Sequence, residues 1–218
     1  MPRKYRIVQH VAGFNQIGGP PSVLRRVLRS RLADKYDFAL VTQDYPAGGV
    51  NLRLIHEMAT KMRHFRPDLV HVRGLQNEGF HGVLAAYWAG CRNVVVSVHG
   101  FARDSRSRYP LRSWIVSRLL EPLTMIMARH VYCVCKSAVN RLEIQRYAGD
   151  KCSVIYNGIE ISPPMSRDST FRAQLGAAPN DTVGLYVGRI VYDKGLGVLL
   201  NALYQTPFPS ILWLAGDG

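Results

Sequence analysis

The sequence predicts an α/β fold built on a parallel, doubly wound sheet. Two observations favour this class: short β-branched or aromatic runs alternate with helical stretches, and a turn separates each run from the next stretch. Alternation of this kind places helices on both faces of a parallel sheet and ligands at the carboxyl ends of its strands. With 47% hydrophobic and 20% charged residues, the 218-residue chain can bury a core, which excludes a disordered basic tail.

The first part of the chain carries six predicted strands. They are Arg6–Val11, Phe38–Thr42, Leu69–Val72, Val94–Val98, Val131–Cys135 and Ser153–Tyr156. A helix is predicted between the first two, because Val23, Val27, Leu28 and Leu32 recur at helical spacing with arginines on the opposite face.

The segment Ser162–Ser166 predicts a linker, since its two prolines continue neither a helix nor a central strand. Beyond it we expect a helix near Ser169–Leu175, a strand Val183–Val187, a helix Leu196–Tyr204 and a strand Ile211–Ala215. These elements predict a Rossmann-like domain at 1–160, a linker with its helix at 161–180, and the start of a second domain at 181–218. A lone β-α-β unit leaves sheet edges uncovered, so the second domain is expected to be incomplete.

Charge and cysteine content indicate what kind of α/β protein the chain forms. Lys and Arg number 28 against 15 Asp and Glu, a formal charge of +13. The longest apolar stretch, 111–128, is interrupted by charges, so we expect no membrane-spanning helix. No apolar leader is evident and the four cysteines are too sparse for a disulfide scaffold, which predicts reduced thiols and a cytoplasmic protein.

Two loops in the first part are candidate ligand sites. Gly18 and Gly19 lie between the first strand and the following helix, where backbone N–H groups and the helix dipole can cradle a phosphate. The alternative is a tight turn with proline at the helix start. His99 follows the fourth predicted strand, where it can bond a substrate hydroxyl or merely cap the strand end.

The strongest candidate follows the strand Val183–Val187. Arg189 and Lys194 flank a loop with glycines on both sides, a combination that suits a diphosphate, although a solvated basic loop has the same composition. No metal-ligand spacing is present: Cys133 and Cys135 are expected to face one side of a strand as buried thiols.

Together, these motifs resemble glycosyltransferase family 4. The resemblance rests on their order and spacing along the whole chain: Gly18-Gly19, Pro67–His71, Ser97–Gly100, Val154–Glu160, Gly188–Gly195 and Ala215–Gly218. It implies a retaining enzyme of the GT-B fold, with a complete N-terminal Rossmann-like domain and a truncated second one. It also implies a nucleotide-sugar donor, a glycan or lipid-linked acceptor, polysaccharide biosynthesis, and no metal or other cofactor.

The resemblance further implies roles for single residues. Arg189 and Lys194 would bind the donor diphosphate, helped by the backbone around Gly18 and Gly19, and His99 would hold a sugar hydroxyl. The remaining motif residues would lie near the nucleoside or the hinge: Asn157, Gly158, Gly188, Gly216 and Gly218. The family also carries two glutamates downstream of this last segment, and the chain ends at Gly218. We therefore expect weak or no transfer by these 218 residues, and the alternative is a non-catalytic remnant or a half-enzyme that needs a partner chain.

The basic residues form two groups. One lies at the start of the chain, and the other comprises Arg103, Arg106, Arg108, Arg112 and Arg118 beside Tyr109, Trp114 and Ile115. This mixture predicts contact with an anionic membrane surface at the inner face of the membrane, or else a solvated helix face. A nucleic-acid-binding module is less favoured, because no helix-turn-helix, RNP or zinc-finger pattern accompanies the pI of about 10.0.

Overall fold

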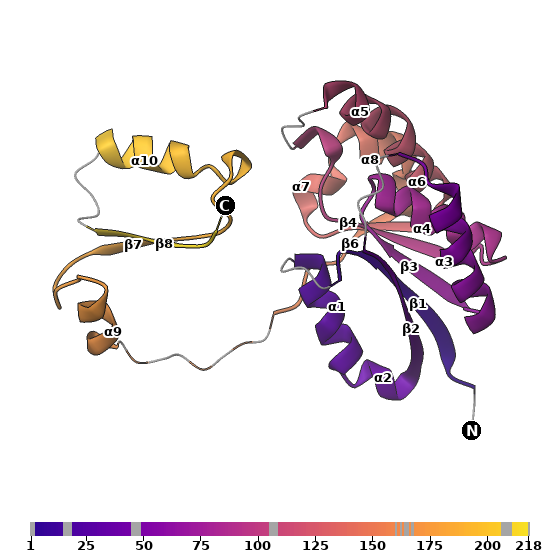
Figure 1. Ribbon diagram of the computed structural model, residues 1–218, viewed down its shortest axis with the longest axis horizontal. Helices are drawn as coiled ribbons and strands as arrows, with labels where there is room; N and C mark the ends of the chain where they lie inside the picture. The colour runs from indigo at the N-terminus through magenta and orange to yellow at the C-terminus, as the bar shows by residue number, and fades with distance from the viewer. Residues whose placement is uncertain are drawn as a thin grey trace. The chain divides into compact units, whose positions relative to one another are not determined.

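A computed structural model describes residues 3–14, 19–44, 49–104, 109–159, 161, 163, 166, 168–205 and 211–217. The chain divides into two compact units, Met1–Ile159 and Glu160–Gly218. Each unit has its own parallel sheet (Figure 1). The two units are therefore described separately.

The sheet of the first unit has six parallel strands in the order β2-β1-β3-β4-β5-β6. Their bounds are β1 (Tyr5–Ala12), β2 (Tyr36–Gln43), β3 (Leu69–Arg73), β4 (Val94–Val98), β5 (His130–Cys133) and β6 (Cys152–Val154). The chain moves to one side of β1 for β2 and to the other side for β3. This reversal is a topological switch point, where ligands of doubly wound sheets bind.

Helices cover the sheet of the first unit. They are α1 (Gly19–Arg29), α2 (Leu32–Lys35), α3 (Leu52–Phe65), α4 (Asn77–Trp88), α5 (Pro110–Ile115), α6 (Glu121–Met127), α7 (Lys136–Val139) and α8 (Leu142–Tyr147). A π-helical turn, Val116–Leu120, joins α5 to α6, and short 3₁₀ turns span Ala102–Asp104 and Gly149–Lys151. Helices α3, α4 and α6 lie on one side of the sheet, while α1 lies on the other (Figure 1).

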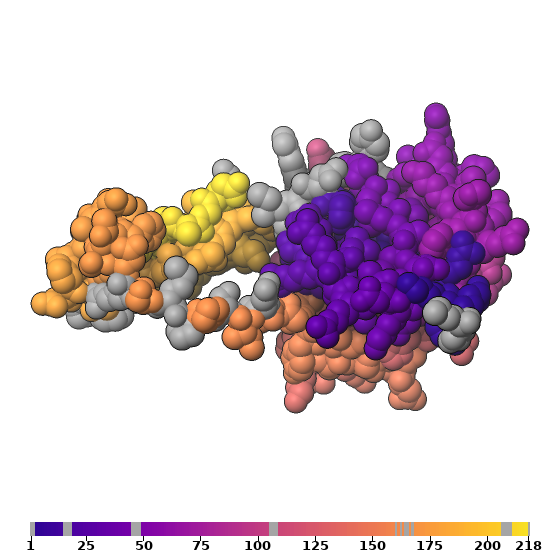
Figure 2. Space-filling view, turned by 90° about the horizontal axis from the view of Figure 1, so that it is seen from below, coloured from indigo at the N-terminus to yellow at the C-terminus, as the bar shows by residue number. Residues whose placement is uncertain are grey.

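The two faces of this sheet differ in chemistry. On the face toward α3 and α4, alternate strand residues such as Val8, Val70, Val72 and Val96 join one apolar core. The opposite face carries a group of polar residues, Gln9, His71 and Ser97, at intervening positions, because successive side chains of a strand point to opposite faces. Helix α1 lies beside the end of the unit (Figure 2), where Arg26 Nη1 donates to the Gly158 carbonyl at 3.1 Å.

The second unit is a β-α-β arrangement preceded by a short helix. Its elements are α9 (Ser169–Gln174), β7 (Val183–Val187), the 3₁₀ turn Tyr192–Lys194, α10 (Leu196–Gln205) and β8 (Ile211–Ala215). Strands β7 and β8 pair in parallel over five residues each. Asp168 caps α9 by accepting from the Phe171 N–H at 2.9 Å.

The predicted strands and helices are confirmed, with differences at their ends. The fifth and sixth strands end earlier than predicted, at Cys133 and Val154, because β5 and β6 pair only over three residues. The expectation that Cys133 and Cys135 face one side of a strand is therefore wrong. Cys133 is buried in β5, whereas Cys135 lies beyond the strand, half-buried, at the start of α7.

Candidate functional site

His99 lies one residue beyond the carboxyl end of β4, beside a cavity of about 300 Å³. The walls of this cavity come from the loops after β4 and β5, and its polar members are His99, Asp104, Cys135, Ser137 and Arg141. Burial and the positive charge of Arg73 lower the pKa of His99 to about 4. At neutral pH the ring is therefore uncharged. One of its nitrogens carries a hydrogen and can donate, and the other can accept a hydrogen bond from a hydroxyl.

The outer wall of the cavity is held by an ion pair. Arg141 Nη1 donates to both carboxylate oxygens of Asp104, at 2.8 and 2.9 Å, and its guanidinium lies 4.1 Å from the centroid of the Phe101 ring. Cys135 faces the same cavity, and hydrogen bonding to the Ser137 hydroxyl lowers the pKa of its thiol. These contacts fix the β4 and β5 loops around His99.

A network of polar side chains lies behind His99 on the polar face of the sheet. His99 Nε2 is 3.0 Å from Ser97 Oγ, which is 3.1 Å from His71 Nε2. His71 in turn contacts Gln9 Oε1 and the Tyr132 hydroxyl, each at 3.1 Å. Buried Arg73 donates to the same Gln9 oxygen at 2.8 Å. Among the members of this network, the sequence analysis assigned a role to His99 alone.

The sequence signal for this network is weak but present. Strand positions that face a helix layer are usually apolar, and Gln9, His71 and Ser97 are polar exceptions inside otherwise β-branched runs. Strand register then places them together, since Gln9 pairs with His71, and Arg73 with Ser97, across β1, β3 and β4.

Helix α1 follows β1 in the chain and begins near the switch point. Gly19 is the first residue of α1, an 11-residue helix, so the positive end of its dipole lies there. Gly18 lies outside the described residues. Asn157 and Gly158 follow β6 in an extended segment close to the end of the first unit.

The second unit brings its own predicted residues to one edge. The Gly188 N–H donates to the Ala215 carbonyl at 3.0 Å, and the Ile190 N–H to the Asp217 carbonyl at 2.6 Å. A Cβ on Gly216 would lie 1.8 Å from the Gly188 carbonyl oxygen, so the two strand ends approach closely only because residue 216 is glycine. Gly218 lies outside the described residues.

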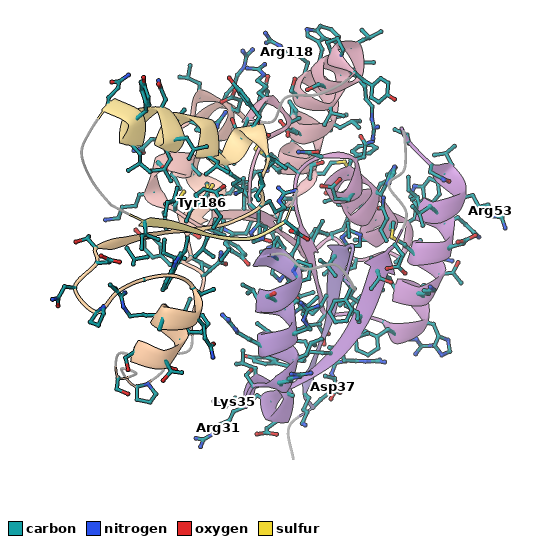
Figure 3. All side chains as sticks on the ribbon, turned by 60° about the vertical axis from the view of Figure 1, so that its left-hand side comes forward. Arg31, Lys35, Asp37, Arg53, Arg118 and Tyr186 are labelled. Carbon is teal, nitrogen blue, oxygen red and sulfur yellow. The ribbon has the colours of Figure 1, made fainter. Side chains whose placement is uncertain are left out.

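Arg189 and Lys194 lie at the same edge, both exposed. Within the described part of the chain, neither side chain forms an ion pair. Hydrogen bonds to backbone carbonyls hold the loop between them. The Tyr186 hydroxyl donates to the Arg189 carbonyl at 3.0 Å, and the Gly195 N–H donates to the Tyr192 carbonyl at 3.1 Å (Figure 3 labels Tyr186). Helix α10 starts at Leu196, directly after Lys194 and Gly195. Two exposed cations thus lie in the loop that leads into the N-terminus of α10.

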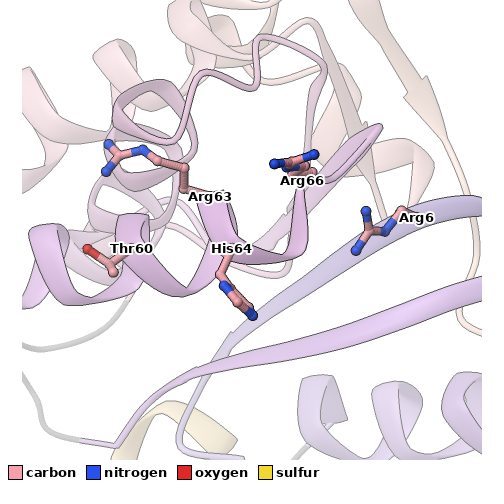
Figure 4. A pocket seen from close by; sticks show the side chains of 5 residues that line it. All are labelled: Arg6, Thr60, Arg63, His64 and Arg66. Atoms are coloured by element: carbon pink, nitrogen blue, oxygen red, sulfur yellow. The ribbon is translucent and has the colours of Figure 1, made fainter.

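A larger hollow, of about 560 Å³, lies at the opposite edge of the first sheet (Figure 4). It is lined by Arg6, Thr60, Arg63, His64 and Arg66 around the C-terminal end of α3. Cations at a helix C-terminus are stabilised by the helix dipole, which accounts for Arg63 and His64 without a ligand. None of the predicted site residues is among those that line it.

The described residues contain no group of three or more His, Cys, Asp or Glu side chains arranged to hold a metal ion. Nor does any helix in the described part combine the length and apolar character needed to cross a bilayer.

Two Rossmann-like units, each presenting its predicted residues at the carboxyl ends of parallel strands, define a GT-B-type α/β protein. The family model for Glycosyltransferase Family 4 matches residues 18–162. The chain belongs to this family. No curated protein matches the chain.

Solved structures support the fold. HepE of Anabaena, solved in complex with UDP-glucose, is similar with a TM-score of 0.70 at 22% identity, over 97% of this chain and 60% of HepE. Sucrose-phosphate synthase of Thermosynechococcus elongatus gives 0.69 at 14% identity, over 98% and 62%. UDP-GlcNAc 2-epimerase of Neisseria meningitidis, bound to UDP-GlcNAc, gives 0.51 at 14% identity, over 96% and 66%. The chain thus spans about three fifths of the length of the first two structures.

Proposed function

We propose that this protein is a retaining glycosyltransferase that moves a sugar from a nucleotide-sugar donor to a glycan or lipid-linked acceptor. The observation that carries the proposal, beside the family membership, is the pair of exposed cations, Arg189 and Lys194, ahead of α10. UDP-glucose in HepE supports a uridine nucleotide as the first donor to test. We propose a role in polysaccharide biosynthesis on the same basis.

In this proposal the second unit binds the donor diphosphate. Arg189 contributes a planar fork that suits phosphate oxygens, Lys194 adds a point charge, and the first N–H groups of α10 add partial positive charge. Gly188 and Gly216 are proposed to lie near the nucleoside, at the carboxyl ends of β7 and β8. Gly18 and Gly218 are proposed to assist, together with Gly19. Asn157 and Gly158 are proposed to form the hinge.

The proposed reaction is a substitution at the anomeric carbon. The acceptor oxygen bonds to this carbon, and the bond to the diphosphate oxygen breaks with its electron pair leaving on the nucleoside diphosphate. The acceptor proton passes to the departing diphosphate, and the new bond forms on the face that the donor bond occupied. Arg189 and Lys194 stabilise the negative charge that develops on the leaving group, so no metal is required. His99 holds a sugar hydroxyl in place.

Titration of the full chain with UDP tests the donor half. We expect binding that Arg189→Ala and Lys194→Ala each weaken about tenfold, the loss of about 1.4 kcal/mol of charge-assisted bonding. Arg31→Ala, an exposed arginine of the first unit, should leave the affinity unchanged (Figure 3). Adding EDTA should also leave it unchanged. Equal losses of UDP affinity in all three variants would show that binding depends only on the net charge of the protein. That result would refute the donor site at Arg189 and Lys194.

Transfer itself is tested by mass change of an acceptor incubated with UDP-glucose. Weak or absent transfer by these 218 residues stays a prediction. So does the need for a partner chain, which would appear as activity restored by a second polypeptide.

We propose an anionic membrane surface as the place where the acceptor is met. The continuous segment from α5 through the π-helical turn to α6 exposes Leu111, Trp114, Leu119 and Leu123, with exposed fractions of 72, 57, 52 and 42%. Arg112 and Arg118 lie on the same segment, and Arg118 projects from its outer side (Figure 3). Apolar side chains beside arginines suit the interface of an anionic bilayer.

Co-sedimentation with phosphatidylglycerol vesicles at low salt tests the membrane contact. We expect the Trp114→Ser variant to bind several-fold less than the unchanged protein, since an interfacial tryptophan is lost. Trp88→Ser, an exposed tryptophan of α4, is the matched control. Binding that is absent at low salt would remove the membrane proposal.

A further inference from the structure

The polar network behind His99 has a direction that can be read from its hydrogen-bonding groups. It begins at Arg73, which is 4% exposed and has no ion pair within the described part of the chain. A guanidinium can only donate, so the Gln9 atom 2.8 Å away is the amide oxygen, which can only accept. Arg73 therefore fixes the orientation of the Gln9 amide.

The Gln9 oxygen then fixes the protonation of His71. Because this oxygen only accepts, His71 Nδ1 at 3.1 Å must carry the hydrogen. Burial and the charge of Arg73 hold the pKa of His71 well below its ordinary value, so the ring carries a single hydrogen. His71 Nε2 is consequently an acceptor with one lone pair.

Two hydroxyls compete for this lone pair, those of Ser97 and Tyr132, each at 3.1 Å. Ser97 is fully buried, and its other acceptor, the Val72 carbonyl, lies at 3.5 Å, the outer limit of a hydrogen bond. When the Ser97 hydroxyl donates to His71, its lone pairs stay free to accept from His99, so Ser97 is paired both as a donor and as an acceptor. Tyr132 is only half-buried, so its hydroxyl can bond water instead.

The last link is His99. If Ser97 donates to His71, it accepts from His99 Nε2 at 3.0 Å, so this nitrogen carries the hydrogen. His99 Nδ1 is then left as a bare acceptor. An acceptor of this kind bonds a hydroxyl hydrogen and repels a phosphate or carboxylate oxygen.

We propose that Gln9, His71 and Ser97 are positioning residues that fix His99 in the Nε2–H tautomer, with Arg73 as the fixed end of the chain. In this tautomer, His99 Nδ1 binds a hydroxyl group of the ligand in the cavity and disfavours an anionic group. The hydroxyl of a sugar as this ligand rests on the proposed function, whereas the tautomer of His99 does not.

Nitrogen-15 NMR of the histidine rings in the free, full-length chain tests the relay, because protonated and bare ring nitrogens have well-separated shifts. Single His→Gln variants assign the signals. We expect His71 as the Nδ1–H form and about 90% of His99 as the Nε2–H form, since this arrangement uses both the hydrogen and a lone pair of the buried Ser97 hydroxyl within the network. Observation of His99 chiefly as the Nδ1–H form would overturn the relay.

Variants show whether the tautomer is set at a distance. In Ser97→Ala we expect His99 to become a mixture of both tautomers, and in Gln9→Leu we expect the same for His71. Gln9→Glu, which keeps an acceptor oxygen, should restore His71. The matched control is Ser153→Ala, which removes an analogous serine–histidine bond, from Ser153 to His130 at 2.8 Å, outside the chain of contacts. It should leave His99 unchanged.

The outcomes separate the relay from the proposed function. If Ser97→Ala leaves the His99 tautomer unchanged, the relay is wrong whatever UDP does. If the tautomers behave as expected while UDP fails to bind, the relay stands and the donor proposal falls. Should Ser97→Ala not fold, Tyr132→Phe provides the second measurement: removing the competing hydroxyl must keep or raise the Nε2–H fraction, and a fall would overturn the relay.

Discussion

Glu121 is a buried carboxylic acid whose replacement by glutamine should make the protein more stable above neutral pH. The residue is 2% exposed, at the start of α6, and its Oε1 accepts from the Ala102 N–H at 2.7 Å. Burial raises its pKa from 4.5 to about 7, although the Ala102 hydrogen bond and the nearby arginines oppose the shift. Glutamine keeps the accepting oxygen and removes the charge.

The size and sign follow from proton linkage. Between pH 4.5 and 7 the folded chain keeps this proton while the unfolded chain loses it, so the free energy of unfolding falls as the pH rises. A shift of roughly 2.5 pKa units at about 1.4 kcal/mol per unit corresponds to about 3 kcal/mol. Most of this, about 2.5 kcal/mol, is lost between pH 5 and pH 8.

Urea unfolding followed by far-UV circular dichroism at pH 5, 6, 7 and 8 measures the effect. The difference between Glu121→Gln and the unchanged protein should grow by about 2–3 kcal/mol across this range, and all other titrating groups cancel in the difference. Glu57→Gln, in the exposed pair with Arg53, should differ by at most about 0.5 kcal/mol at every pH. A difference for Glu121→Gln that stays flat from pH 5 to 8 would refute the reasoning.

Two further predictions concern the two units separately. In the first unit, burial holds the pKa of His10 near 3 and that of His99 near 4. The unfolded chain therefore takes up protons below pH 6.5 that the folded chain does not bind. In the Glu121→Gln variant, where the opposing titration of Glu121 is absent, the urea midpoint should fall steadily from pH 6.5 to 4, and a constant midpoint would contradict this. In the second unit, Gly216→Ala should speed hydrogen exchange of the β7–β8 amides at least tenfold, because its Cβ would meet the Gly188 carbonyl. Gly197→Ala, which meets nothing within 4 Å, should not, and equal exchange in both variants would show that the strand ends are not tightly packed.

Much of the fold could be predicted from the sequence, because its strands are short runs rich in β-branched and aromatic residues, separated by turns. Val94–Val98, Val183–Val187 and Ile211–Ala215 were predicted with the bounds that the structure shows. Local composition fails where pairing decides the length of a strand. The run Val131–Cys135 has β propensity throughout, yet β5 ends at Cys133 because β6 offers no partner beyond it.

The positions of the candidate residues on the sheet were predictable for a similar reason. In a parallel sheet the carboxyl end of each strand marks the side on which ligands bind, so His99, Arg189 and Lys194 could be placed on that side from the strand pattern. The order and spacing of the motifs also led to the right family.

The network behind His99 could not be found this way. Its members are Gln9, His71, Ser97 and Tyr132, and up to 62 residues of sequence separate the pairs that touch. A polar residue within a strand does not reveal its partner, because that depends on which strands are neighbours and on their register. The sequence by itself determined the strands, the glycine loops and the cations. Only the tertiary structure decided which buried groups share hydrogen bonds, since strand order and register bring these donors and acceptors within reach of one another.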